Sequence, residues 1–260
     1  MNIGIFDSGL GGLIITRAIK EAMNEYDYVY MGDTLHVPYG ARSRDAVYEF
    51  TKNCIDTMFR EYDCMAIIIA CNTASAVLAR LQQEYLPQNY PDRRILGMVI
   101  PTAEVAAASN GKRIGLLATE GTVRSNIYGD ELTLLDKNIN LFSVAAPLLV
   151  PLIENDGDKF AMPVIMEYIQ NFPDIDTLIL GCTHYPHYKY EIRSLLPNIN
   201  LLSQDEIIPE KLREYFSRHP EIESRLSRNG TCRFFVTDIS DSYMKQANRM
   251  FGSDIDVVKI

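Results

Sequence analysis

The feature that most constrains the fold is the alternation of short apolar runs with helix-length amphipathic stretches along all 260 residues. Runs such as Ile3–Phe6 and Met65–Ala70 are apolar at nearly every position, which is typical of strands buried on both faces. Strands that alternate with helices form parallel sheets, so the pattern predicts an α/β fold. The predicted strands are Ile3–Phe6, Tyr28–Met31, Met65–Ala70, Ile95–Ile100, Arg113–Ala118, Leu141–Ala145, Thr177–Leu180, Ile199–Leu202, Arg233–Val236 and Asp256–Val258. The clearest predicted helices are Leu10–Met23, Thr73–Gln83 and Ile207–Phe216.

A weak internal repeat links the two halves of the chain. Ile3–Ser8 aligns with Ile114–Thr119, and Ile67–Thr73 aligns with Leu178–His184. In each half, the hydroxyl that ends the first segment precedes the cysteine of the second segment by 63 positions. Ligands bind at the carboxyl ends of the strands in open parallel sheets. The repeat predicts two similar halves with a cysteine on each side of one cleft, although recurrent buried strands alone also produce such a likeness.

Charge limits the classes of partner. The chain carries 34 acidic against 25 basic side chains, a net charge of −9, which argues against binding to nucleic acid. An anionic substrate would need local donors, such as backbone N–H groups, hydroxyls and helix N-termini.

Other features predict a cytoplasmic protein that does not cross a membrane. The longest apolar stretch, Val144–Ile153, contains two prolines and is shorter than the roughly 18 residues of a membrane span. The chain opens on an apolar strand without a basic leader, so we expect no signal peptide. The five cysteines are odd in number and form no C-x-x-C pair, which favours free thiols.

Two of these cysteines are candidates for thiol chemistry. Cys71 and Cys182 each follow a predicted strand and precede a helix. A helix N-terminus lowers the pKa of a thiol, so we expect both to be acidic. An isolated cysteine is more often a small buried hydrophobic residue, but two at matching positions favour function. We expect Cys54, Cys64 and Cys232 to contribute packing only.

A carboxylate and a histidine accompany the two thiols. Asp7 and Ser8 lead into Gly9–Gly12, which lacks the third glycine of a dinucleotide fingerprint and the lysine of a P-loop. This segment is either a tight turn or an anion-binding loop beside a thiol. His184 is placed to exchange protons with Cys182. A zinc site that also includes His187 is the alternative, but no paired ligand cluster accompanies it, and we predict no metal.

Four segments carry a family resemblance. Ile5–Gly12, Val37–Gly40, Ala70–Ala76 and Gly181–Pro186 resemble the signature segments of glutamate racemases, within the aspartate/glutamate racemase superfamily. The likeness covers nearly the whole chain. It implies two pseudo-symmetric α/β lobes with the active site between them, and interconversion of L- and D-glutamate without a cofactor, which supplies D-glutamate for peptidoglycan. It also implies a homodimer. We expect the interleaved lobes to comprise residues 1–97 with 206–260, and residues 98–205.

The resemblance also implies roles for individual residues. By motif, Cys71 and Cys182 match the two acid/base thiols, and the accompanying catalytic groups are Asp7, His184 and Glu154. The implied substrate contacts are Asp7, Ser8, Tyr39, Gly40, Asn72, Thr73, Thr119, Thr122, Thr183 and His184. Two segments depart from the family pattern. His187 and Tyr188 stand where aliphatic residues are common, and Leu202–Asp205 replaces an Asp-Ser pair, so we expect the first to alter the cleft lining or the lobe interface.

The residues favour this chemistry on physical grounds as well. Inversion at a stereocentre needs one group to remove a proton from one face and another to deliver a proton to the opposite face. No lysine lies within the motifs, so a pyridoxal Schiff base is not indicated. An aspartate racemase or a related isomerase is the alternative enzyme, whereas a decarboxylase of the superfamily would need one cysteine only. A two-lobed binding protein for small molecules is the alternative without catalysis.

Overall fold

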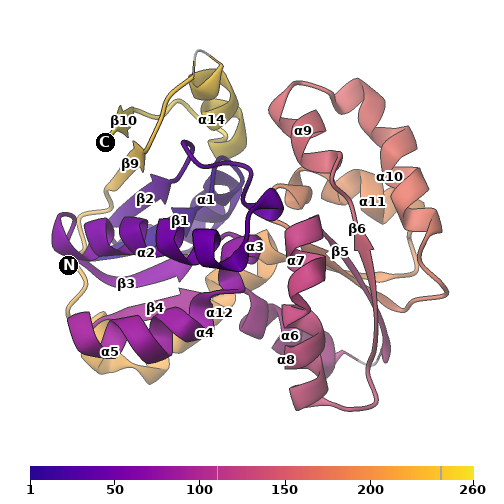
Figure 1. The fold of residues 1–260 in the computed structure, drawn as a ribbon, viewed down its shortest axis with the longest axis horizontal. Helices are drawn as coiled ribbons and strands as arrows, with labels where there is room; N and C mark the ends of the chain where they lie inside the picture. Colours follow the sequence, from indigo (N-terminus) through magenta and orange to yellow (C-terminus); the bar gives the residue numbers. More distant parts are fainter. Residues whose placement is uncertain (110, 241) are drawn as a thin grey trace.

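Two lobes lie side by side in the computed structural model, which describes residues 1–109, 111–240 and 242–260 (Figure 1). Each lobe is built on one parallel sheet, with strand order β10-β9-β2-β1-β3-β4 in the first and β6-β5-β7-β8 in the second. The predicted two-lobed α/β fold is therefore confirmed. The strands are β1 (Asn2–Asp7), β2 (Tyr28–Gly32), β3 (Cys64–Ile69), β4 (Arg94–Gly97), β5 (Arg113–Ala118), β6 (Asn140–Ala145), β7 (Thr177–Gly181), β8 (Asn200–Ser203), β9 (Cys232–Val236) and β10 (Val257–Lys259).

The internal repeat corresponds to a repeated unit of four strands. The order β2-β1-β3-β4 in the first sheet matches β6-β5-β7-β8 in the second, and β9 and β10 extend the first sheet alone. The register repeats too, because Gly4 lies opposite Ile67 and Gly115 lies opposite Leu178, a separation of 63 positions in both pairs. The likeness between the halves thus exceeds that of unrelated buried strands.

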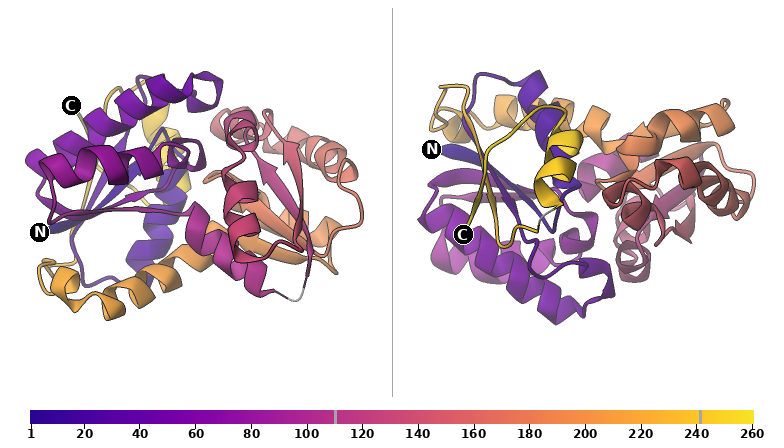
Figure 2. Two further views of the ribbon diagram at one scale, coloured as in Figure 1. Left: turned by 60° about the horizontal axis from the view of Figure 1, so that its bottom comes forward. Right: turned by 90° about the horizontal axis from the view of Figure 1, so that it is seen from above.

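Helices cover both faces of each sheet, as the two views of Figure 2 show. In the first lobe, apolar residues of α1 pack on one face of the sheet and those of α2 on the other. None of the described helices is long and apolar enough to cross a membrane. The α-helices are α1 (Gly12–Ala22), α2 (Arg44–Arg60), α3 (Asn72–Ser75), α4 (Leu78–Arg80), α5 (Leu86–Asn89), α6 (Val99–Ala108), α7 (Glu120–Ser125), α8 (Ile127–Leu135), α9 (Leu149–Glu154), α10 (Ala161–Gln170), α11 (Lys189–Leu195), α12 (Gln204–Arg218), α13 (Pro220–Glu223) and α14 (Tyr243–Phe251). Short helical turns of other types are η1 (Tyr39–Ala41), η2 (Leu81–Tyr85), η3 (Asp158–Phe160) and η4 (Tyr185–Tyr188).

Two predicted elements differ from the observed ones. The strand predicted over Ile95–Ile100 ends at Gly97, and α6 begins at Val99, because the fixed backbone angle of Pro101 suits the first turn of a helix. The helix predicted over Thr73–Gln83 is broken into α3, α4 and the π-helical turn η2. Pro87 follows that turn and has no N–H to offer to the preceding turn, which favours a local change in helix type.

The lobes share one apolar core and a buried polar junction. A single cluster of buried side chains includes Ile3 and Leu13 of the first lobe and Leu117 and Leu178 of the second. Helix α12 contacts α1 on one side and α6 on the other. The lobe boundaries expected at residues 97 and 205 remain a prediction, because the helix that begins beside the second of them belongs to both packing surfaces.

Gln204, at the start of α12, is fully buried within a network of side chains from both lobes. Asn72 Nδ2 donates to Gln204 Oε1 at 2.7 Å, and Gln204 Nε2 donates to Asn72 Oδ1 at 3.0 Å. Tyr128 donates its hydroxyl to Asn72 Oδ1 at 2.9 Å and accepts from Gln204 Nε2 at 3.0 Å. Because every member is paired, this network fixes the junction without leaving a buried polar atom of these amides unsatisfied.

We predict that Tyr128→Phe destabilises the protein by about 1–2 kcal/mol, since it removes one donor and one acceptor from a buried network. Urea denaturation followed by circular dichroism measures the free energy of unfolding. Tyr190→Phe is the matched control, because Tyr190 is 71% exposed. Equal losses of stability in the two variants would contradict the role assigned to the network.

Candidate active site

Side chains from the strand ends of both lobes meet across the junction. Asp7 ends β1 and Cys71 follows β3 in the first lobe, while Thr119 follows β5 and Cys182 follows β7 in the second. Thr183 Oγ1 lies 3.4 Å from Asp7 Oδ1, so contacts between the lobes occur directly at these ends. The structure therefore brings the two halves of the predicted site together.

Cys71 is enclosed and protonated at neutral pH. Its Sγ accepts hydrogen bonds from Ser8 Oγ at 3.3 Å and from the Ala74 N–H at 3.4 Å, and the residue is 7% exposed. Burial raises the pKa of Cys71 to about 12, with a further rise from the charge of Asp7. The expectation of a lowered pKa is wrong for this thiol, because the cost of burying a thiolate outweighs the dipole of the four-residue helix α3.

Cys182 has a different set of neighbours. Its Sγ lies 3.8 Å from His184 Nδ1, and His184 Nε2 lies 2.8 Å from Glu154 Oε1. Burial alone would lower the pKa of His184, but hydrogen bonds to Cys182 and Glu154 raise it well above 6.5. The imidazole of His184 thus lies between the sulfur and a carboxylate, and its contacts with both favour the protonated form. A negative charge on Cys182 would raise the pKa of Cys71, so the two thiols are within electrostatic reach of each other.

Asp7 lies between the two thiol environments. It is 1% exposed and accepts a hydrogen bond from the Gly9 N–H at 2.8 Å. Burial raises its pKa, and the nearby charge of His184 acts in the opposite direction. The glycine loop approaches the second lobe closely, because a Cβ at Gly11 would lie 2.3 Å from both His184 Nδ1 and Thr183 Oγ1. This close approach between the lobes is a role that neither interpretation of the loop included.

Small residues of both lobes form a contact that we call the seam, made of Gly40, Thr73, Thr119, Gly121 and Thr122. The Oγ1 atoms of Thr73 and Thr119 are 3.0 Å apart, as are those of Thr119 and Thr122. A Cβ on Gly121 would lie 2.9 Å from Gly40 Cα, so only glycine permits this approach of the two backbones. The seam closes the junction on the side of η1 and α7.

Two predicted substrate contacts have side chains that are already paired. The Tyr39 hydroxyl donates to Asp33 Oδ2 at 2.6 Å, and Asp33 also accepts from Thr237 at 2.8 Å. Asn72 is held by Gln204 and Tyr128 as described above. Any contact that these two residues make with a substrate is therefore expected from their backbone or from the tyrosine ring rather than from these polar atoms.

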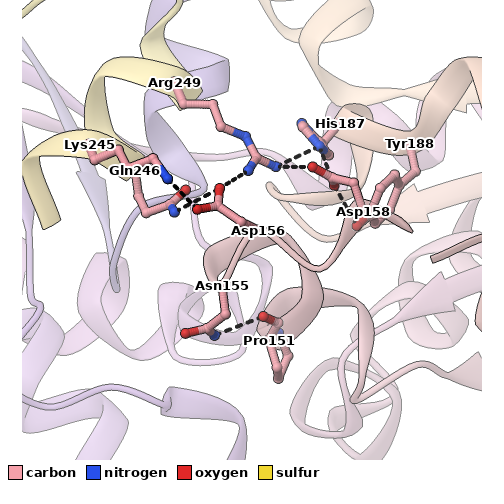
Figure 3. Close-up of polar contacts among 9 residues, drawn as sticks. All are labelled: Pro151, Asn155, Asp156, Asp158, His187, Tyr188, Lys245, Gln246 and Arg249. Carbon is pink, nitrogen blue, oxygen red and sulfur yellow. Dashed lines mark hydrogen bonds and ion pairs between the residues drawn. The ribbon is translucent and has the colours of Figure 1, made fainter. Parts of the chain in front are cut away.

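Charged side chains of both lobes form a cluster beside the site (Figure 3). From α14, Arg249 Nη1 donates to Asp156 Oδ1 at 2.6 Å and Nη2 donates to Asp158 Oδ2 at 2.8 Å. Lys245 and Gln246 also bind Asp156. These aspartates lie two and four positions after Glu154, so the cluster anchors the segment that presents Glu154 to His184. Sequence reasoning missed this cluster because its partners are about 90 positions apart.

Both residues of the first departure from the family pattern, His187 and Tyr188, take part in this cluster. His187 Nε2 lies 3.0 Å from both Asp158 Oδ1 and Arg249 Nη2, and Tyr188 donates to Asp158 at 2.9 Å (Figure 3). His187 thus lies at the lobe interface through its contact with Arg249. His187 contacts this cluster, and among the described residues no group of three or more His, Cys, Asp or Glu side chains is arranged to hold a metal ion.

Comparisons with known proteins agree with this geometry. The sequence profile of the Asp/Glu/hydantoin racemase family matches residues 3–207. A glutamate racemase of Sulfurihydrogenibium sp. is 37% identical, with 100% of this chain and 97% of the relative covered. A crystal structure of a glutamate racemase isoform from Bacillus anthracis has a TM-score of 0.89 at 30% identity, with coverage of 100% and 97%. A glutamate racemase from Francisella tularensis in complex with D-glutamate has a TM-score of 0.88 at 28% identity, with coverage of 100% and 96%.

The fold and the matches define an isomerase of the amino-acid racemase class. The chain belongs to the Asp/Glu/hydantoin racemase family, which confirms the resemblance inferred from the four segments.

We predict that Glu154→Gln lowers the pKa of His184, because it removes one of the two partners that stabilise the imidazolium. Titration of the imidazole by NMR measures the midpoint. Glu221→Gln is the matched control, since Glu221 pairs with the exposed His219. An unchanged His184 midpoint in Glu154→Gln would contradict the assigned contact.

The same substitution has a pH-dependent effect on stability. The folded-state pKa of His184 lies above its ordinary value of 6.5, so its contribution is fully present below that pH and is lost as the pH rises through the folded pKa. The wild type should therefore exceed Glu154→Gln in stability most clearly below about pH 6.5. Urea denaturation across this range measures the difference, and a gap that widened toward alkaline pH would contradict the assignment.

Proposed function

We propose that the protein is a glutamate racemase, which interconverts L- and D-glutamate with its own side chains and without a cofactor. The observation that carries this proposal is the pair of buried cysteines at equivalent strand ends of two similar lobes, each with a separate polar partner. The full-length likeness to glutamate racemases supports glutamate as the substrate. The proposal places the enzyme in the cytoplasm as a homodimer that supplies D-glutamate for peptidoglycan, as the family resemblance implies.

In the proposed mechanism, the two thiols act on opposite faces of the α-carbon. One cysteine, as thiolate, removes the α-proton, and the electron pair of the broken C–H bond remains on the α-carbon. The other cysteine, as thiol, donates its proton to the opposite face and becomes the thiolate. The roles of Cys71 and Cys182 exchange with the direction of reaction. Because one thiolate is consumed and one is formed, the charge of the site is unchanged over each turnover.

The neighbours of the thiols support different parts of this proton transfer. His184 holds a proton beside Cys182, and its charge stabilises a thiolate there. Ser8 donates to the sulfur of Cys71 and plays the corresponding part as a neutral group. The hydroxyls of Thr73, Thr119 and Thr183 lie near the junction as donors for the substrate carboxylates and for the charge that develops beside them.

We predict that Cys71→Ser and Cys182→Ser each lower kcat for racemisation by about 10³-fold or more, since an alcohol is a far weaker acid and base than a thiol. Polarimetry with L-glutamate and with D-glutamate measures both directions. Cys232→Ser is the control, because Cys232 lies in β9, outside the junction. Wild-type turnover in either active-site variant would exclude the two-thiol mechanism.

A second prediction concerns the source of the transferred proton. In D2O, D-glutamate formed from L-glutamate should carry deuterium at the α-carbon, because the delivering thiol exchanges with solvent between turnovers. NMR of the α-proton and polarimetry, recorded together in the presence of a metal chelator, follow the reaction. If L-glutamate remains unchanged while L-aspartate racemises, the substrate assignment is wrong. If neither reacts but glutamate binds stoichiometrically, the protein is a binding protein.

A further inference from the structure

A cavity of about 460 Å³ lies on the outer side of the seam and is lined by three arginines. It is bounded by η1, the start of α2 and α7, so both lobes contribute to its walls. No aspartate or glutamate is among the residues that line it. The lining residues are Ala41, Arg42, Ser43, Arg44, Val47, Thr73, Ala76, Val77, Gly121, Arg124 and Ser125.

The positive charge of this cavity is not neutralised by its surroundings. Arg44 Nη2 donates to the carbonyl of Ala76 at 2.9 Å, and Arg124 Nη2 donates to the carbonyl of Gly40 at 3.1 Å. Both partners are neutral, so the guanidinium charges are retained. Within the described part of the chain, Arg42, Arg44 and Arg124 form no ion pair, although acidic residues exceed basic ones by nine over the whole sequence. Asp45, the nearest acidic residue in sequence to Arg44, pairs with Arg80 instead.

The cavity adjoins the proposed active site through two shared residues. Thr73 and Gly121 belong to the seam and also line the cavity. Cys71 and Cys182 are only 7% and 6% exposed, so a substrate reaches the space between them only after the lobes separate. Separation at the seam would open the junction directly into the cavity, because Thr73 and Gly121 belong to both.

We propose that this cavity is the entrance of the active site, where Arg42, Arg44 and Arg124 capture the dicarboxylate substrate before the seam opens. The inference rests on the proposed function and adds the route and the recognition step. Glutamate carries two carboxylates and one ammonium, a net charge of −1. A guanidinium binds a carboxylate through two parallel hydrogen bonds, and a local positive potential raises the concentration of an anion at the entrance. An acidic chain needs such a local site because its overall field repels the substrate.

The test is the dependence of kcat/KM on ionic strength. In the wild type, kcat/KM for L-glutamate should fall as KCl rises from about 10 to about 300 mM, since salt screens the attraction. The variant Arg42→Glu/Arg44→Glu/Arg124→Glu should have a kcat/KM lowered by roughly tenfold at low salt. Its kcat/KM should also rise with salt, because screening then relieves a repulsion. Far-UV circular dichroism verifies that the variant is folded.

Two further variants separate charge from other effects. Arg42→Lys/Arg44→Lys/Arg124→Lys keeps the charge, so the wild-type sign of the salt dependence should persist. Arg60→Glu is the matched control, because Arg60 is an exposed arginine at the far end of the same helix α2. It should leave kcat/KM within about twofold of the wild type, since its distance from the entrance along the helix exceeds the Debye length at moderate salt.

The possible results distinguish this inference from the proposed function. Absence of racemisation in the wild type would refute the proposed function itself. An active wild type whose salt dependence is shared by the triple glutamate variant would overturn the proposal that this cavity is the entrance. A triple variant that loses kcat by the same factor as kcat/KM would also overturn it, because that result would place the arginines at the reacting centre.

Discussion

The close approach of the two lobes at Gly11 and His184 is the contact on which the site depends. It brings the glycine loop after β1 against the residue that follows Cys182, and only a residue without a side chain fits at Gly11. Thr183 reaches Asp7 at the same place. The seam and the charged cluster around Arg249 hold the lobes together on either side of this contact. The polar groups of the site are therefore arranged by packing between lobes rather than within either of them.

Such an arrangement removes the thiols from water, and this has an electrostatic cost. Cys71 is held in its neutral form by burial, whereas His184 keeps its charge despite burial because it lies between a sulfur and a carboxylate. The site can hold one negative charge on sulfur only where a partner compensates for lost hydration. Repetition of the four-strand unit supplies the two thiols, and the differences between the units supply their unequal neighbours.

Much of the fold could be predicted from sequence because buried parallel strands leave a continuous apolar signal, and the separation of 63 positions reappears as strand register. Predictions from local sequence were wrong where contacts with distant residues determine the outcome. Examples are the broken helix after Asn72 and the raised pKa of Cys71. The contact of Glu154 with His184 was expected only through the family resemblance. Gln204 and Arg249 had no pattern of their own, since their partners lie more than 60 positions away in sequence.

In the proposed reaction, thermodynamics limits what the unequal environments of the two thiols can do. Mirror-image amino acids have equal free energies in water, so the equilibrium constant is one, and kcat/KM must be the same in both directions. A charged histidine beside Cys182 and a neutral serine beside Cys71 therefore cannot favour one enantiomer overall. Any difference in kcat between the two directions must be matched by a difference in KM of the same factor. The asymmetry of the site sets how far the enzyme is saturated by each enantiomer, and it leaves the final mixture unchanged.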